Sequence, residues 1–192
     1  RRFSDGTQVV IKMNNFSVLL LLLAATLLPA EDARADDKRG FAVNVGVGAS
    51  EISDKDGADR FKGNGFGYSI GAEYRFNRNF ALGFGIFSLG TAEDEFAGTT
   101  TEIEVRGADF LMRFIVPVNE GFEFYGSVGQ SWYTADLEPG GNNGLFGDTA
   151  VEFGLGLDIG SGPLAFRLAA RYFDGPKDEA GALLTAGFNY LF

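Results

Sequence analysis

Apolar side chains alternate with small or charged side chains at every second position over much of the chain. The clearest stretch is residues 66–76, where Phe, Tyr, Ile and Ala fill the even positions and Gly, Ser, Glu and Arg the odd ones. Successive side chains of a strand point to opposite faces of its sheet, whereas a helix repeats every 3.6 residues. Because no segment keeps the helical period, the pattern predicts an all-β chain whose strands each have one apolar face.

The alternation recurs in eight segments. We expect strands at about residues 40–50, 66–76, 79–89, 102–116, 121–133, 149–159, 164–173 and 182–192. In the fourth segment the apolar residues move from odd to even positions near Gly107, which predicts a β-bulge there. Short and long connections alternate strictly, so one rim carries tight turns and the other carries loops. This asymmetry predicts an eight-stranded antiparallel up-and-down β-barrel.

The longer connections are polar and largely acidic. These loops are expected at residues 51–65, 90–101, 134–148 and 174–180. The chain has a net charge of −10, which argues against nucleic acid as a partner. Residues 54–59 contain three Asp and faintly resemble a calcium loop, but Gly65 occupies the twelfth position, where a bidentate Glu is needed. We therefore expect no metal, and we place any surface ligand at these loops.

The alternation alone leaves open which way the apolar face points. A soluble periplasmic barrel of the lipocalin type would bind an apolar ligand inside, whereas a transmembrane barrel turns its apolar face to lipid. The chain has 20 Phe, too many for the narrow interior of eight strands. The opposite face carries carboxylates and arginines that can pair in a closed lumen. These residues are Glu73, Arg75, Asp109, Arg113, Glu123, Glu152, Asp158, Arg167 and Arg171. We predict a transmembrane barrel with a plugged lumen and no large pore, and the soluble barrel is the alternative.

The N-terminal region reads as an export signal. Residues 18–28 are an apolar run, and Pro29 and the small-x-small sequence at residues 33–35 follow it. The run is shorter than the roughly 20 apolar residues that a transmembrane helix needs. We therefore predict a cleavable signal peptide within residues 1–35 and a barrel domain over residues 36–192.

Two segments carry a resemblance to a known family. Residues 71–82 read as a strand, a tight turn and a strand, and residues 186–192 form a last strand of alternating aromatics with a C-terminal Phe. With these motifs the predicted domain resembles the small eight-stranded outer-membrane β-barrels of Gram-negative bacteria, the OmpA-type and OmpX-type group. The resemblance implies a cell outer-membrane location and a monomer surrounded by lipid and lipopolysaccharide. It also implies that the barrel-assembly machinery recognises Phe188, Tyr190 and Phe192.

The role that the resemblance implies is structural, in membrane integrity, or a surface interaction of the adhesin type. The chain has no His and no Cys, which removes Cys–His and Ser–His–Asp catalysis. Outer-membrane enzymes that resemble this chain rely on a His. The carboxylates of the inward face are expected to pair with Arg rather than to act as acids or bases. We therefore expect neither enzymatic activity nor a cofactor.

Overall fold

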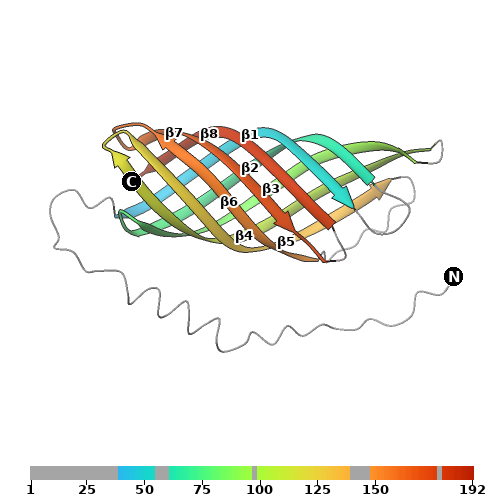
Figure 1. Cartoon of the computed structure of the whole chain (residues 1–192), viewed down its shortest axis with the longest axis horizontal. Coiled ribbons are helices and arrows are strands. Elements are labelled where there is room, and N and C mark those ends of the chain that lie inside the picture. The colour runs from blue at the N-terminus through green and yellow to red at the C-terminus, as the bar shows by residue number, and fades with distance from the viewer. Residues whose placement is uncertain (1–38, 55–60, 97–98, 139–147, 177–178) are drawn as a thin grey trace, which may run out of the picture. The chain divides into compact units, whose positions relative to one another are not determined.

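Eight antiparallel strands close into a single barrel (Figure 1). The computed structural model describes residues 39–54, 61–96, 99–138, 148–176 and 179–192. The strands are β1 (Gly40–Asp54), β2 (Phe61–Asn77), β3 (Phe80–Phe96), β4 (Thr99–Asn119), β5 (Phe122–Glu138), β6 (Thr149–Ile159), β7 (Leu164–Asp174) and β8 (Glu179–Leu191). Each strand pairs with the next, and β1 also pairs with β8, so the predicted up-and-down barrel is confirmed.

Some predicted features lie outside the described residues. The signal peptide predicted within residues 1–35 is one of them, and it stays a prediction. The calcium-like residues 54–59 fall almost wholly outside as well. Among the described residues, no helix is long and apolar enough to cross a membrane.

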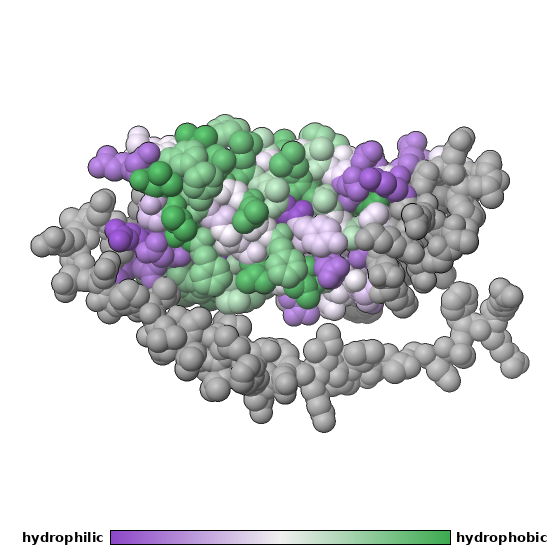
Figure 2. Space-filling view, viewed as in Figure 1, coloured by the Kyte–Doolittle hydropathy of each residue, from purple (hydrophilic) through white to green (hydrophobic). Residues whose placement is uncertain are grey.

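The apolar face of the strands points outward. Phe84 is 58% exposed and Leu155 71% exposed, whereas Ala42 and Ala81, on inward positions, are fully buried. In Figure 2 apolar residues cover the middle of the visible face, and hydrophilic residues gather at both ends. An eight-stranded interior holds only packed side chains, so the many large apolar groups must lie outside. The soluble alternative required these groups inside, and the structure contradicts it.

Aromatic side chains form a belt at each end of the apolar band. We call the end of the barrel that carries the tight turns the turn rim. There Tyr74 packs edge-on against Phe41 and Phe76, with ring centroids 5.0 and 4.9 Å apart. At the opposite end, the loop rim, exposed aromatic residues include Phe66, Tyr68, Trp132 and Tyr172. Ten residue steps separate Phe66 from Phe76, which is about 25 Å along the axis at about 3.3 Å per residue and a tilt of about 40°. This is the height of the apolar band of transmembrane barrels.

The strands extend further at the loop rim than the sequence predicts. β1 continues to Asp54, β3 to Phe96 and β5 to Glu138, so the predicted loop boundaries at 51, 90 and 134 are wrong. Two residues separate β3 from β4, a connection as short as the turn between β2 and β3. The apolar alternation stops where a strand leaves the apolar band, but its hydrogen-bonded ladder continues beyond that point. The loop rim is therefore distinguished by projecting strands as well as by loops.

The β-bulge predicted at Gly107 is also wrong. β4 keeps its register with β3 and β5 at that residue. The register shift lies instead in β3, between Ser88 and Gly90. Gly90 has a φ of 72°, which favours glycine, and its N–H donates to Ser88 Oγ at 2.9 Å. Val105 faces inward, and the parity change in β4 reflects a lumen that becomes apolar toward the loop rim.

Candidate functional site

The lumen near the turn rim holds a compact group of charged side chains. This turn-side cluster consists of Glu73, Arg75, Arg113, Glu123, Asp158 and Arg167. Its members come from β2, β4, β5, β6 and β7, because strand alternation turns every second residue inward. Three arginines meet three carboxylates, so the cluster is neutral, and each member is at most 9% exposed. Charges buried this deeply are tolerated only when they are paired.

Hydrogen bonds link the turn-side cluster across the barrel. Arg167 donates from Nε and Nη2 to the two carboxylate oxygens of Asp158, both at 2.7 Å. Arg75 donates to Glu123 at 2.9 Å. Arg113 pairs with Glu73. Planar guanidinium groups suit this site because they bind carboxylates through two parallel hydrogen bonds.

Tyr125 is the aromatic platform of the turn-side cluster. The guanidinium carbon of Arg113 lies 4.5 Å from its ring centroid, and that of Arg167 lies 4.9 Å away. Both distances are within the range of cation–π attraction. Tyr125 also packs with buried Ala81 and Ile115. The cluster is therefore held by packing as well as by ion pairs.

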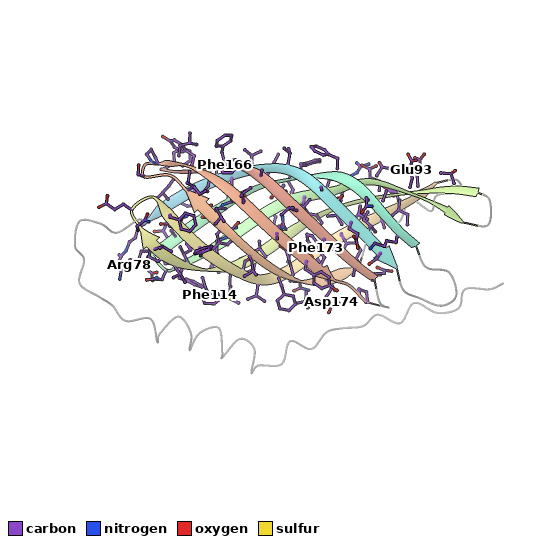
Figure 3. All side chains as sticks on the ribbon, turned by 45° about the horizontal axis from the view of Figure 1, so that its top comes forward. Arg78, Glu93, Phe114, Phe166, Phe173 and Asp174 are labelled. Atoms are coloured by element: carbon purple, nitrogen blue, oxygen red, sulfur yellow. The ribbon has the colours of Figure 1, made fainter. Side chains whose placement is uncertain are left out.

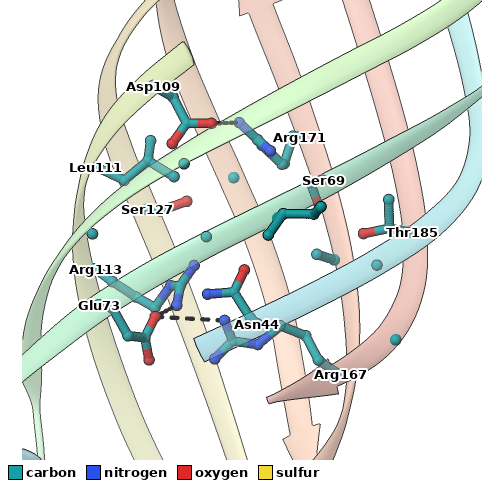
Figure 4. A pocket seen from close by; sticks show the side chains of 18 of the residues that line it. Asn44, Ser69, Glu73, Asp109, Leu111, Arg113, Ser127, Arg167, Arg171 and Thr185 are labelled. Carbon is teal, nitrogen blue, oxygen red and sulfur yellow. Dashed lines mark hydrogen bonds and ion pairs between the residues drawn. The ribbon is translucent and has the colours of Figure 1, made fainter. Parts of the chain in front are cut away.

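A second group, the loop-side cluster, consists of Asp109, Glu152 and Arg171. Arg171 donates to the two oxygens of Glu152 at 2.6 and 2.9 Å, and its Nη2 also bonds Asp109. One arginine between two carboxylates leaves this cluster with one excess negative charge. A cavity of about 40 Å³ lies between the two clusters, large enough for a few water molecules (Figure 4). Its polar lining includes Asn44, Ser69, Ser127 and Thr185.

Two stacked rings cover the loop-side cluster. Phe87 and Phe173 lie with ring centroids 4.6 Å apart and an interplanar angle of 26°, and we call them the phenylalanine plate. The Arg171 guanidinium carbon lies 5.2 Å from the first ring and 5.1 Å from the second. Around the plate and toward the loop rim the lumen contains a cluster of buried apolar side chains, namely Ile52, Leu89, Ala92, Val105, Ala150 and Leu183.

The structure groups the nine predicted lumen residues into two clusters. The sequence did not predict the phenylalanine plate or the apolar cluster above it. Phe87, Phe173 and Leu183 stand on the inward parity of their strands, and that parity was the available signal. Many other inward residues are small or charged, so these three residues depart from the pattern that predicts the lumen.

The three aromatics predicted as an assembly signal are exposed at the end of the chain, with Phe188 and Tyr190 on the outer face of β8 and Phe192 directly after it. Phe188 is 52% exposed, Tyr190 42% and Phe192 74%. Phe188 packs edge-on against Phe166 of β7, with ring centroids 5.9 Å apart. Figure 3 shows Phe166 and Phe114 on the outside of the barrel. This position suits contact with lipid, and it also leaves the side chains accessible to another protein.

The family comparison agrees with this geometry. The sequence model of a family described as "Outer membrane protein beta-barrel domain" matches residues 20–192. The chain belongs to this family. The resemblance stated from the sequence is thereby confirmed, and the protein is an outer-membrane β-barrel. Its outward apolar face and aromatic belts lie in the outer membrane.

Solved structures of outer-membrane barrels share the fold. Ail of Yersinia pestis, in complex with the heparin analogue sucrose octasulfate, is 16% identical, with a TM-score of 0.52 over 80% of this chain and 99% of that chain. Neisserial surface protein A is 20% identical, with a TM-score of 0.57 over 80% and 97%. OprG from Pseudomonas aeruginosa is 14% identical, with a TM-score of 0.58 over 84% and 99%. A search of the curated proteins found no match.

Proposed function

We propose that this outer-membrane barrel forms no large pore. It supports the integrity of the outer membrane and presents the loop rim of the barrel for surface interaction. The observation that carries the proposal is the filling of the lumen. Two charge clusters and the phenylalanine plate succeed one another along its axis. The side chains of each cluster and of the plate come from different strands. A large aqueous channel would therefore require the loss of buried ion pairs.

Conductance across a planar lipid bilayer tests the closed lumen. The purified barrel is inserted at neutral pH, and the current is recorded under an applied voltage. We expect no stable channel openings of the size that porins give, because the interior of eight strands is filled with side chains. Long-lived, large openings in the wild-type protein would contradict the proposal.

The outer surface beyond the aromatic belt supports a surface role. Several outward residues of β3, β4 and β5 are acidic there, and Glu93 stands directly opposite Glu102. Glu104 faces Asp136 in the same way and also accepts hydrogen bonds from Arg106 at 2.8 and 2.6 Å. Like charges in opposite positions destabilise a strand pair. We infer that this surface favours cationic partners and repels polysulfated ligands such as the one bound to Ail.

A binding assay on vesicles tests this preference. The reconstituted barrel is mixed with an oligolysine peptide or with heparin, at low and at high salt. We expect the oligolysine peptide to bind and heparin not to bind. High salt should weaken the binding of the peptide, because exposed charges are screened. The double variant Glu93→Gln/Glu102→Gln should bind the peptide less. Heparin binding to the wild-type protein would contradict the proposal.

We propose that the barrel is a monomer, that lipopolysaccharide surrounds its loop-side belt, and that the barrel-assembly machinery recognises Phe188, Tyr190 and Phe192.

We also propose that the protein is not an enzyme. Each of the five carboxylates in the two charge clusters is paired with an arginine, which leaves none of these five positioned as a general acid or base.

A further inference from the structure

An apolar pocket of about 160 Å³ lies in the lumen above the phenylalanine plate. Phe87 and Phe173 form its floor, and both are less than 5% exposed. Its walls are mostly aliphatic, and they include Ile52, Leu89, Ile103, Val105 and Ala150. We propose that this pocket binds a compact, uncharged aromatic molecule of about the size of phenol, which enters from the loop rim.

The size and the lining of the pocket define the ligand class. A protein cavity of about 150 Å³ lined by Leu, Ile and Phe stays dry and binds benzene. The present pocket has a similar volume and similar walls. Aromatic rings prefer offset-stacked or edge-to-face contacts with one another, and the floor offers two ring surfaces for such contacts. A six-membered aromatic ring therefore fits both the volume and the floor.

The polar groups of the pocket lie among the residues near the loop rim. The Tyr133 hydroxyl donates to Glu179 Oε2 at 2.6 Å. The Ser53 hydroxyl donates weakly, at 3.5 Å, to the carbonyl oxygen of Ala180. All four residues line the pocket, so a ligand with one hydroxyl can keep it near these groups while its ring rests on the plate. The carboxylate of Glu179 disfavours an anionic ligand.

The plate makes the pocket a binding site rather than a passage. The rings of Phe87 and Phe173 separate the pocket from the Arg171 guanidinium, which lies against both of them. A ligand that crossed the barrel would have to part these rings and then pass two clusters of buried ion pairs. Binding here goes beyond the structural role proposed above, and a closed lumen is compatible with it.

Methyl NMR spectroscopy tests the pocket directly. The folded barrel, with labelled Ile, Leu and Val methyl groups, is titrated in detergent micelles with phenol and, separately, with benzoate. We expect saturable shifts with phenol at Ile52, Leu89 and Ile103, and no saturable shifts with benzoate. The lipid-facing methyl groups of Val43 and Leu155 report the partition of phenol into the detergent. Their shifts should increase with phenol concentration without saturating. Pocket shifts that are absent, or that do not saturate, would overturn the proposal.

A pair of matched variants locates the binding. Val105→Phe fills the pocket from β4, and Val151→Phe adds the same bulk on the outer face of β6. We expect the first variant to weaken phenol binding by more than about tenfold, and the second to leave it unchanged. Heat-modifiable migration on a gel shows whether each variant is folded. Retained binding in folded Val105→Phe overturns the proposal. If that variant does not fold, the wild-type titration decides.

Discussion

At the scale of single residues, the lumen contains arginines that each form ion pairs with more than one carboxylate. Arg167 forms a two-pronged contact with Asp158 and also lies 3.5 Å from Glu73. Arg171 serves Glu152 and Asp109 in the same way. Removing one arginine therefore leaves several buried carboxylates with fewer partners, and an uncompensated buried charge is costly.

Replacing Arg167 tests this dependence. We expect Arg167→Ala to lower the free energy of unfolding by about 3–5 kcal/mol, the usual cost of breaking a buried ion pair. The measurement is urea unfolding of the barrel in lipid vesicles. Arg106→Ala is the matched control, because its ion pair with Glu104 is exposed, and this variant should change stability little. Unchanged unfolding of Arg167→Ala would show that the lumen pairs do not stabilise the fold.

The sequence predicted which charged residues enter the lumen but not how they group. Strand parity assigns a residue to a face, and this was enough for Glu73 or Arg171. It does not reveal that Arg171 meets Asp109, because those residues are 62 positions apart and on strands that are not neighbours. Such contacts depend on the stagger of the strands around the barrel.

At the scale of the strands, each element combines a lipid-facing side with an inward side. The sequence predicted the strand centres well, and β6 has the predicted bounds. It predicted the outer ends of β3, β4 and β5 poorly, because the outward face changes from apolar to polar where a strand projects beyond the apolar band. Pairing with the neighbouring strand continues along these ends beyond the apolar band.

A charge on the outer face of β6 tests its position in the membrane. Leu155 lies at the middle of the strand and is 71% exposed, so Leu155→Arg should cost about 2–4 kcal/mol, as at a bilayer midplane. Val118 lies near the turn rim, and Val118→Arg should cost at most about 1 kcal/mol. Unfolding in vesicles measures both. Equal costs would show that Leu155 does not face the centre of the bilayer.

The last strand allows lipid contact to be separated from a role in assembly. If Phe192 is part of a signal for the assembly machinery, Phe192→Ala should lower the yield of folded barrel in cells more than it lowers stability in vesicles. Leu164→Ala is the control, because Leu164 is also exposed and pairs with Tyr190 near the same rim. Similar yields for the two variants would favour simple lipid contact.

At the scale of the whole molecule, the barrel is an apolar cylinder around a layered interior. The sequence predicted the closure, the number of strands and the outward apolar face, because all three follow from alternation and interior size. The order of the layers along the axis was not predicted. Phe87 and Phe173 come from β3 and β7 and meet only when the barrel closes.

The outward direction of the apolar face is tested by the depth-dependent quenching of a single tryptophan by brominated lipid chains. Trp132 is the one tryptophan of the chain, so Trp132→Phe provides a silent background. In that background Phe84→Trp and Phe87→Trp place the probe on opposite faces of β3, at positions where the native side chains are 58% and 3% exposed. An outward apolar face predicts strong quenching at position 84 and weak quenching at position 87. Equal quenching, or stronger quenching at position 87, would contradict it.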